Sequence, residues 1–233
     1  MPYFGVYRDA AQVTASHLFA YKHGQDAMDD IFGKIRPKEL FSSRNGIIMS
    51  AEIEMHSDSG VVAIVPDLPD KPTASILSFW ANQYVRDYKV HIIDNEWPKL
   101  DKQIFPFGEL KWRNLDNRKL QFQSRQRPAA RYLYFHYCIQ VLRRAWKAGP
   151  GMKAGLVLKD EFDKPVWATP GRYIARNMLL AFIEEVGNEN ESLMLGASCR
   201  KGNNRNALVD VATAQIASKG DEKTDSEDED SEL

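Results

Sequence analysis

Residues 46–65 contain three short elements in close succession, and this succession constrains the fold more than any other part of the sequence. Gly46–Met49 is apolar and predicts a strand. Ser50–His56 predicts a short helix, with Ser50 as the N-cap whose side chain accepts a hydrogen bond from a free amide of the first turn. Val61–Val65 is rich in β-branched residues and is bounded by glycine and proline, so it predicts a buried strand.

Further strands are predicted on both sides of this unit. A short apolar stretch ends at His17 and predicts the first strand of a hairpin with the strand that begins at residue 46. The chain between these two strands is predicted to be a loop through Gly24 and Gly33. Lys89–Ile93 predicts another strand.

The pattern changes to helical spacing after Pro128. Pro128 suits a first helical position, and the segment that follows to Lys147 is long, aromatic and free of glycine. One stripe of this helix is predicted to be apolar: Phe135, Ile139, Leu142 and Trp146. A second helix is predicted from about Pro170 to Val186. The whole pattern indicates an α+β fold.

The formal net charge of −1 conceals a strong asymmetry along the chain. Residues 219–233 carry eight acidic residues against two lysines and have too little apolar area to fold, so this tail is predicted to be disordered. Lys111–Lys147 carries ten Lys or Arg residues and one acid, Asp116. This block is either a track for the phosphates of a polyanion or a set of solvated helix faces. Trp112 and Phe122 within it are interpreted as core residues.

Composition also restricts the compartment. The longest apolar run is shorter than the roughly eighteen residues of a membrane-spanning helix, and no secretory signal is recognisable at the N-terminus. Cys138 and Cys199 are too few for a four-thiolate zinc site and are interpreted as reduced, buried thiols. We therefore expect an intracellular protein, cytoplasmic or nuclear, with no membrane partner.

Four residues form the candidate for chemistry. His17 ends the first strand, and Asn45 precedes the second. Glu54 and Asp58 are four residues apart on the following helix, so they share one face. Two carboxylates so placed could bind a hard divalent cation such as Mg²⁺. A histidine across the hairpin could deprotonate a water for attack on a phosphodiester, and an asparagine could hold that histidine by a hydrogen bond.

The order and spacing of these residues resemble the motif of HNH (ββα-metal) endonucleases. The text from ASHLFAYKHG to RNGIIMSAEIEMHSDSG is similar to HNH-domain proteins found in fungi, in which His-Leu or His-Ile, Asn-Gly and Phe-Asp-x-Gly recur. The segments RPAARYLYFHYCIQVLRRAW and WATPGRYIARNMLLAFIEEVG also resemble the helical extension of those proteins. The resemblance covers about residues 11–195.

The resemblance implies a role for each candidate residue. His17 matches the general base and Asn45 the residue that orients it, while Glu54 and Asp58 match metal ligands, with Mg²⁺ as the expected metal. Three positions depart from the family pattern: Ser16 stands where many members have Asp or His, Glu54 replaces the third motif histidine, and Ser57 stands in the place of Phe. The site is therefore expected to be degenerate at the third motif position.

Three segments and two functions follow from these observations. Residues 1–100 are expected to form an HNH-like ββα core with further strands, residues 101–200 a basic segment with the helical extension, and residues 201–233 the acidic tail. The expected function is that of a metal-dependent endonuclease acting on nucleic acid, DNA in preference to RNA. The alternative is a catalytically inactive HNH-derived module that binds nucleic acid or protein.

Each candidate residue also has a purely structural interpretation. His17 is alternatively an ordinary hydrogen-bonded or surface histidine, and Glu54 with Asp58 a solvated helix face. His136 lies in the aromatic helix and is expected to be a core or partner histidine. His91 lies in a predicted strand and carries no supporting pattern.

Overall fold

In its described residues, the computed structural model contains three separate two-stranded sheets and the helices α1 to α4, and residues 156–157 and 159–161 are also helical. The described residues are 2–3, 6–7, 13–34, 37–106, 108–148, 156–157, 159–161 and 167. The predicted helix from Pro170 to Val186, Cys199 and the acidic tail from 219 to 233 lie outside them. Strands β1 (Pro2–Tyr3) and β2 (Val6–Tyr7) form a short antiparallel pair.

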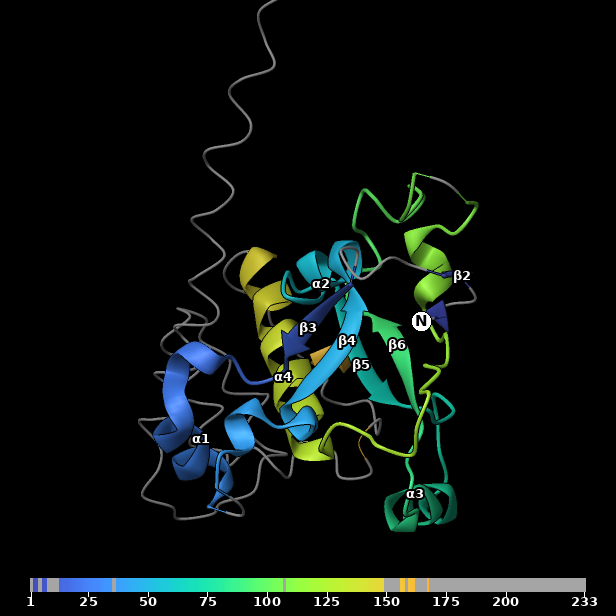
Figure 1. The fold of residues 1–233 in the computed structure, drawn as a ribbon. Helices are drawn as coiled ribbons and strands as arrows, with labels where there is room; N and C mark the ends of the chain where they lie inside the picture. The colour runs from blue at the N-terminus through green and yellow to red at the C-terminus, as the bar shows by residue number, and fades with distance from the viewer. Residues whose placement is uncertain are drawn as a thin grey trace, which may run out of the picture.

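Two antiparallel hairpins supply the other strands. The first pairs β3 (Val13–His17) with β4 (Gly46–Ser50), in a register that sets His17 opposite Gly46 and Val13 opposite Ser50. The second pairs β5 (Val62–Pro66) with β6 (Tyr88–Ile92). The predicted strands are confirmed, with ends displaced by one residue or less. Figure 1 shows the β3–β4 hairpin in front of the other pair.

Helix α2 (Ala51–Ser57) begins directly after β4, as predicted. The Ser50 hydroxyl accepts a hydrogen bond from the Ile53 amide at 3.4 Å, so Ser50 is the N-cap. Ile47 and Met49 alternate inward along β4 and line the same apolar interior as Ile53 of α2, whereas Ile48 between them is exposed. This ββα arrangement confirms the α+β class.

Helix α4 (Ala130–Lys147) is the central element of the core. It packs against β5 and carries twelve buried residues. Phe135, Ile139 and Leu142 of its predicted apolar stripe are buried, but Trp146 in the last turn is exposed. Burial raises the pKa of the Cys138 thiol, so this cysteine is an inert core residue.

Helix α1 corrects the sequence interpretation, and helix α3 lies where no element was predicted. The predicted loop between His17 and Asn45 contains α1 (Gly24–Phe32), together with 3-10 helices at Tyr21–His23, Glu39–Phe41 and Ser43–Asn45. Helix α1 forms because Met28, Ile31 and Phe32 lie at helical spacing and pack on the core. Helix α3 (Ala74–Asn82) is preceded by the N-cap Thr73, whose hydroxyl accepts a hydrogen bond from the Ile76 amide.

The loop between β6 and α4 also packs into the same core. Trp112, in the 3-10 helix Trp112–Leu115, is buried as predicted, and Phe122 is partly buried beneath the Arg127 guanidinium. One hydrophobic cluster therefore includes side chains from both sides of residue 100. No helix among the described residues is long and apolar enough to cross a membrane.

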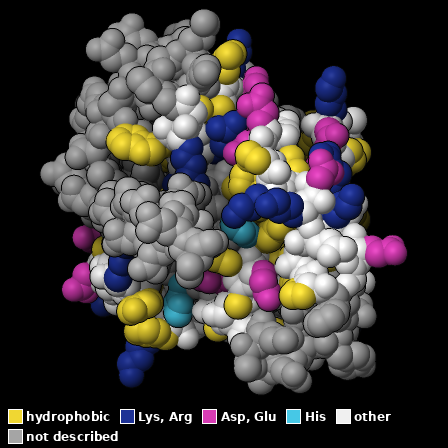
Figure 2. Space-filling model, turned by 90° about the horizontal axis from the view of Figure 1, so that it is seen from above, with side chains coloured by type: hydrophobic (Ala, Val, Ile, Leu, Met, Phe, Trp, Pro, Cys, Tyr) yellow, Lys and Arg dark blue, Asp and Glu magenta, His cyan; other side chains and the backbone are white. Residues whose placement is uncertain are grey.

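The basic block between Lys111 and Lys147 is largely neutralised by acids from other parts of the chain. Six of its basic residues form ion pairs with carboxylates between residues 39 and 101: Arg113, Lys119, Arg127, Arg131, Arg143 and Arg144. On the face in Figure 2, Lys and Arg side chains alternate with Asp and Glu instead of gathering in one patch. These ion pairs indicate that the basic block is mainly a set of solvated, paired side chains and does not form a continuous track for phosphates.

The turn after α2 determines how closely α2 approaches α4. Gly60 has a φ of +77°, and a Cβ at this position would lie 2.8 Å from the backbone nitrogen of Arg144 and 3.0 Å from the Cβ of Arg143. The Gly60 amide donates to the Gln140 side-chain oxygen at 2.9 Å. A glycine is required here by both backbone conformation and contact.

Replacing Gly60 with alanine should therefore lower the free energy of unfolding by at least about 2 kcal/mol, from strain and overpacking together. Gly24→Ala is the matched control, because Gly24 has a φ of +81° but nothing within 4 Å of an added Cβ. Urea unfolding of both variants should show the larger loss for Gly60→Ala. Equal losses would contradict the close contact with α4.

Candidate functional site

His17 lies at the end of the β3–β4 hairpin where the connecting segment 18–45 joins the two strands. Because opposite residues of an antiparallel pair share a face, His17 projects to the same side as Ala15 and the exposed Ile48, away from the buried side chains. Its ring lies 5.8 Å from that of Tyr21 and 6.2 Å from that of Phe41, between centroids. Tyr21 is 64 % exposed and Phe41 72 %, so two accessible aromatic rings flank a half-buried imidazole.

Asn45 fixes the backbone that carries His17. Its side chain is fully buried; its Oδ1 accepts from the Phe19 amide, and its Nδ2 donates to the carbonyls of Phe19 and Leu40, each at 2.9 Å. The Asn45 carbonyl also accepts from the Leu18 amide at 3.0 Å. These contacts go to backbone groups rather than to the imidazole, so Asn45 positions His17 through the chain and not through a direct hydrogen bond.

The segment after His17 is anchored further by aromatic packing. The Phe19 ring lies 5.7 Å from Phe32 of α1 and 5.4 Å from Phe135 of α4. His23 packs 5.6 Å from Phe19, and burial, with a smaller contribution from the charge of Lys22, lowers the pKa of His23 to about 4. His23 is therefore uncharged at neutral pH, and it belongs to the support of this end of the hairpin.

The positions of Ser16 and Glu54 separate them from His17. Ser16 is buried on the inner face of β3. Glu54 lies on α2, which starts after Ser50 at the opposite end of the hairpin from His17 (Figure 1). Four residues of strand correspond to about 13 Å between the two ends. The Glu54 side chain is half-buried, and its carbonyl oxygen accepts from the Ser57 hydroxyl at 2.9 Å.

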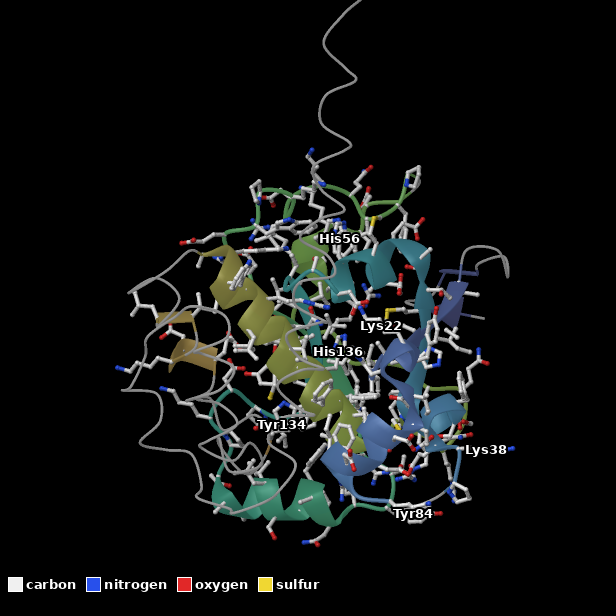
Figure 3. All side chains as sticks on the ribbon, turned by 90° about the vertical axis from the view of Figure 1, so that its left-hand side faces the viewer. Lys22, Lys38, His56, Tyr84, Tyr134 and His136 are labelled. Atoms are coloured by element: carbon white, nitrogen blue, oxygen red, sulfur yellow. The ribbon has the colours of Figure 1, made fainter. Side chains whose placement is uncertain are left out.

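Asp58 faces α4. Its Oδ1 lies 3.4 Å from Nε2 of His136 and 3.5 Å from Nη1 of Arg143, and both partners are buried. Figure 3 shows His136 within the body of the protein on α4. Burial lowers the pKa of the Arg143 guanidinium, and the Asp58 carboxylate acts in the opposite direction. Asp58 therefore supplies the negative charge that a buried guanidinium requires.

These positions can be tested against the metal that the sequence led us to expect. No group of three or more His, Cys, Asp or Glu side chains converges as a metal site among the described residues. Asp58 neutralises a buried cation, Ser16 is a weak ligand on the inner face, and Glu54 follows the far end of the hairpin. The pairing of Asp58 with Arg143 and His136 competes with its predicted role as an Mg²⁺ ligand beside Glu54.

One comparison with known proteins agrees with this hairpin–helix unit. Residues 4–65 match the family model described as HNH endonuclease. The match includes β3, β4, α2 and most of β5, and it spans about a quarter of the 233-residue chain. No curated protein and no solved structure matches the chain.

The HNH match supports a nuclease-type function and a nucleic-acid partner, and HNH nucleases generally use divalent metals. It also contains all four candidate residues. The structure brings His17 and Asn45 together at one end of the hairpin, whereas Glu54 and Asp58 belong to α2 and the turn that follows it.

The sequence interpretation missed the partners of Asp58 on α4. His136, Gln140 and Arg143 are spaced four and three residues apart, so they share one helical face. Three polar residues on one face of an otherwise apolar helix indicate a buried polar contact, and this signal was present in the sequence. No sequence pattern predicts that Tyr21 and Phe41 lie beside His17. Their position depends on how the segment between β3 and β4 folds.

Replacing Asn45 with alanine should destabilise the fold by at least about 2 kcal/mol, because buried amide and carbonyl groups of Phe19 and Leu40 lose their partner. Asn82→Ala is the control, since the Asn82 amide makes a comparable bond to the Ser78 carbonyl at an exposed site. Urea unfolding of the two variants measures the difference. A loss no larger than that of Asn82→Ala would contradict the positioning role.

Replacing Asp58 with asparagine distinguishes an ion-pair role from a metal-ligand role. We expect a loss of stability on the order of 2 kcal/mol, because Arg143 remains buried without its counter-charge. The loss should be the same with and without Mg²⁺, and the exposed Glu96→Gln should show almost none. Stabilisation of the unsubstituted protein by Mg²⁺ that disappears in Asp58→Asn would identify a metal ligand instead.

Proposed function

We propose that this chain is an HNH-derived module that binds nucleic acid at the His17 end of the β3–β4 hairpin without cleaving it. The observation that carries the proposal is the pairing of Asp58 with Arg143 and His136 of α4. A carboxylate that neutralises a buried guanidinium stabilises the fold and is less available to bind a metal ion. The catalytic constellation expected from the family motif is thereby divided between two parts of the domain.

The surface around His17 has the chemistry of a nucleic-acid contact. Tyr21 and Phe41 offer exposed rings on which unpaired bases can stack. Lys22 is exposed next to Tyr21, and the exposed Lys38 extends away from the body of the protein in Figure 3. These ammonium groups can neutralise phosphates. We infer that single-stranded DNA is the preferred partner, with RNA as the comparison.

Cleavage is the second candidate, and the arrangement of His17 and Asn45 favours it. His17 is half-buried at an open edge, and Asn45 holds the backbone on its C-terminal side. An imidazole in this position could accept a proton from a water that attacks phosphorus. Both candidate functions include binding of nucleic acid, and only the second includes cleavage of the phosphodiester bond.

Binding at this surface should depend on the two rings and on salt. Tyr21→Ala and Phe41→Ala should each weaken the affinity for single-stranded DNA at least about fivefold, because stacking on an aromatic ring contributes about 1–3 kcal/mol per base. Phe79→Ala is the control, since Phe79 is 69 % exposed on α3, away from the hairpin. Fluorescence anisotropy at increasing salt should show affinity falling steeply.

The same protein should leave supercoiled DNA intact with Mg²⁺ or Mn²⁺. Metal-stimulated nicking that His17→Ala abolishes would establish the second candidate and overturn the first. Absence of DNA and RNA binding at low salt would overturn both.

A further inference from the structure

A cleft with a mixed apolar and charged lining lies on the β5–β6 hairpin, outside the segment that matches the HNH family except at its edge. Its volume is about 490 Å³, within the range of sites for small organic ligands. Val65, Leu68 and Leu100 form apolar parts of its wall. The basic side chains that line it are Lys71, Lys89 and Arg113.

Lys89 is the most constrained of these cations. Its side chain is only 10 % exposed, and its Nζ donates to the Leu68 carbonyl at 2.7 Å. The nearest carboxylate among the described residues is that of Asp70, at 3.9 Å and 88 % exposed. An ammonium group carries three N–H donors, and among the described residues only the Leu68 carbonyl lies within hydrogen-bond distance of this one. A buried cation with open donors is costly unless an anion pairs with it.

Neither acid of the cleft lies within hydrogen-bond distance of the Lys89 ammonium group. Asp116 Oδ1 accepts from the Ile92 amide at 2.9 Å and lies 3.5 Å from Nδ1 of His91. Burial acts to raise the pKa of Asp116, but the hydrogen bonds from His91 and Ile92, together with the charges of His91 and Lys89, outweigh it and keep the pKa low. Asp70 extends into solvent. Of the three basic residues in the lining, Arg113 is paired with Asp101 outside it, so Lys71 and Lys89 are the cations that remain for a ligand.

The wall beside Lys89 is preformed. Residues two apart on a strand share a face, so Lys89 and His91 both project from β6 into the cleft. His91 Nε2 lies 2.9 Å from a Glu161 carboxylate oxygen, and the Tyr137 hydroxyl of α4 donates to the Glu161 carbonyl at 2.9 Å. These contacts hold His91 and Asp116 in place without a ligand, which lowers the ordering cost of binding.

We propose that this cleft binds a small organic anion of mononucleotide size, with Lys89 pairing with its phosphate. The apolar wall of Leu68 and Leu100 suits a planar base, and the amides of Asn95 and Asn117 in the lining can hydrogen-bond to its edge. The site is separate from the His17 surface, so neither proposal depends on the other.

The test measures binding of the four ribonucleoside monophosphates to the whole protein by calorimetry, with adenosine and inorganic phosphate as further probes. At least one monophosphate should bind, and adenosine should not. Lys89→Met keeps the length and apolar stem of the side chain and should weaken that binding at least tenfold. Lys99→Met, at an exposed position outside the lining, should leave it unchanged.

A second variant keeps the test decisive if Lys89→Met does not fold. Lys71→Glu reverses a charge at the exposed rim and should weaken binding of the same monophosphate several-fold at low salt. Binding of none of the monophosphates, or binding of inorganic phosphate alone, would overturn the proposal. Equal affinity in the unsubstituted protein and in Lys89→Met would also overturn it.

Discussion

The contact between the turn at Gly60 and the backbone of α4 is the constraint on which the rest of the structure depends. Only a glycine lets this turn approach Arg143 and Arg144 so closely, and the Gly60 amide is bonded to Gln140. The Lys147 ammonium donates to the Ser59 carbonyl in the same turn. The end of α2 is therefore held against α4, and Asp58 faces the buried guanidinium of Arg143.

This packing explains why a unit that matches a nuclease family has two ends with different chemistry. At one end of the hairpin, the side-chain amide of Asn45 makes all of its hydrogen bonds to backbone groups. His17 lies at the same end, between two accessible aromatic rings. Beyond the other end, α2 leads into the turn whose carboxylate stabilises a buried cation. Metal-dependent cleavage would require His17 and Asp58 to act on the same phosphate. Asp58 is instead paired with residues of α4.

Charge pairing divides the remaining surface in a similar way. The basic block of the sequence lies beside acids that precede it in the chain, so Lys119 and Arg127 share Asp87, and Arg144 pairs with Asp94. The side-chain hydrogen bond from Lys119 is the main reason that the pKa of Asp87 is low. Lys89 differs from these residues, because it is buried and its nearest carboxylate is 3.9 Å away.

Local pattern was sufficient to predict much of this protein from its sequence. The strands ending at His17 and beginning at Gly46, the cap at Ser50 and the long helix to Lys147 follow from residue type and spacing, since capping and periodicity act over a few residues. Helix α1 was missed because its apolar face is stabilised by contacts with the core and its two bounding glycines indicated a loop.

The partners of the candidate residues were decided only by tertiary structure. Glu54 and Asp58 do share a local spacing, but that spacing cannot reveal that Arg143, far along the chain, requires a counter-charge. Likewise, Lys89 is an ordinary strand lysine in the sequence, and only the packing of β6 against segments before and after it buries Lys89 in a cleft. Long-range contacts determine the partner of Asp58 and the burial of Lys89, because burial and charge pairing depend on distance in space and not on order in the chain.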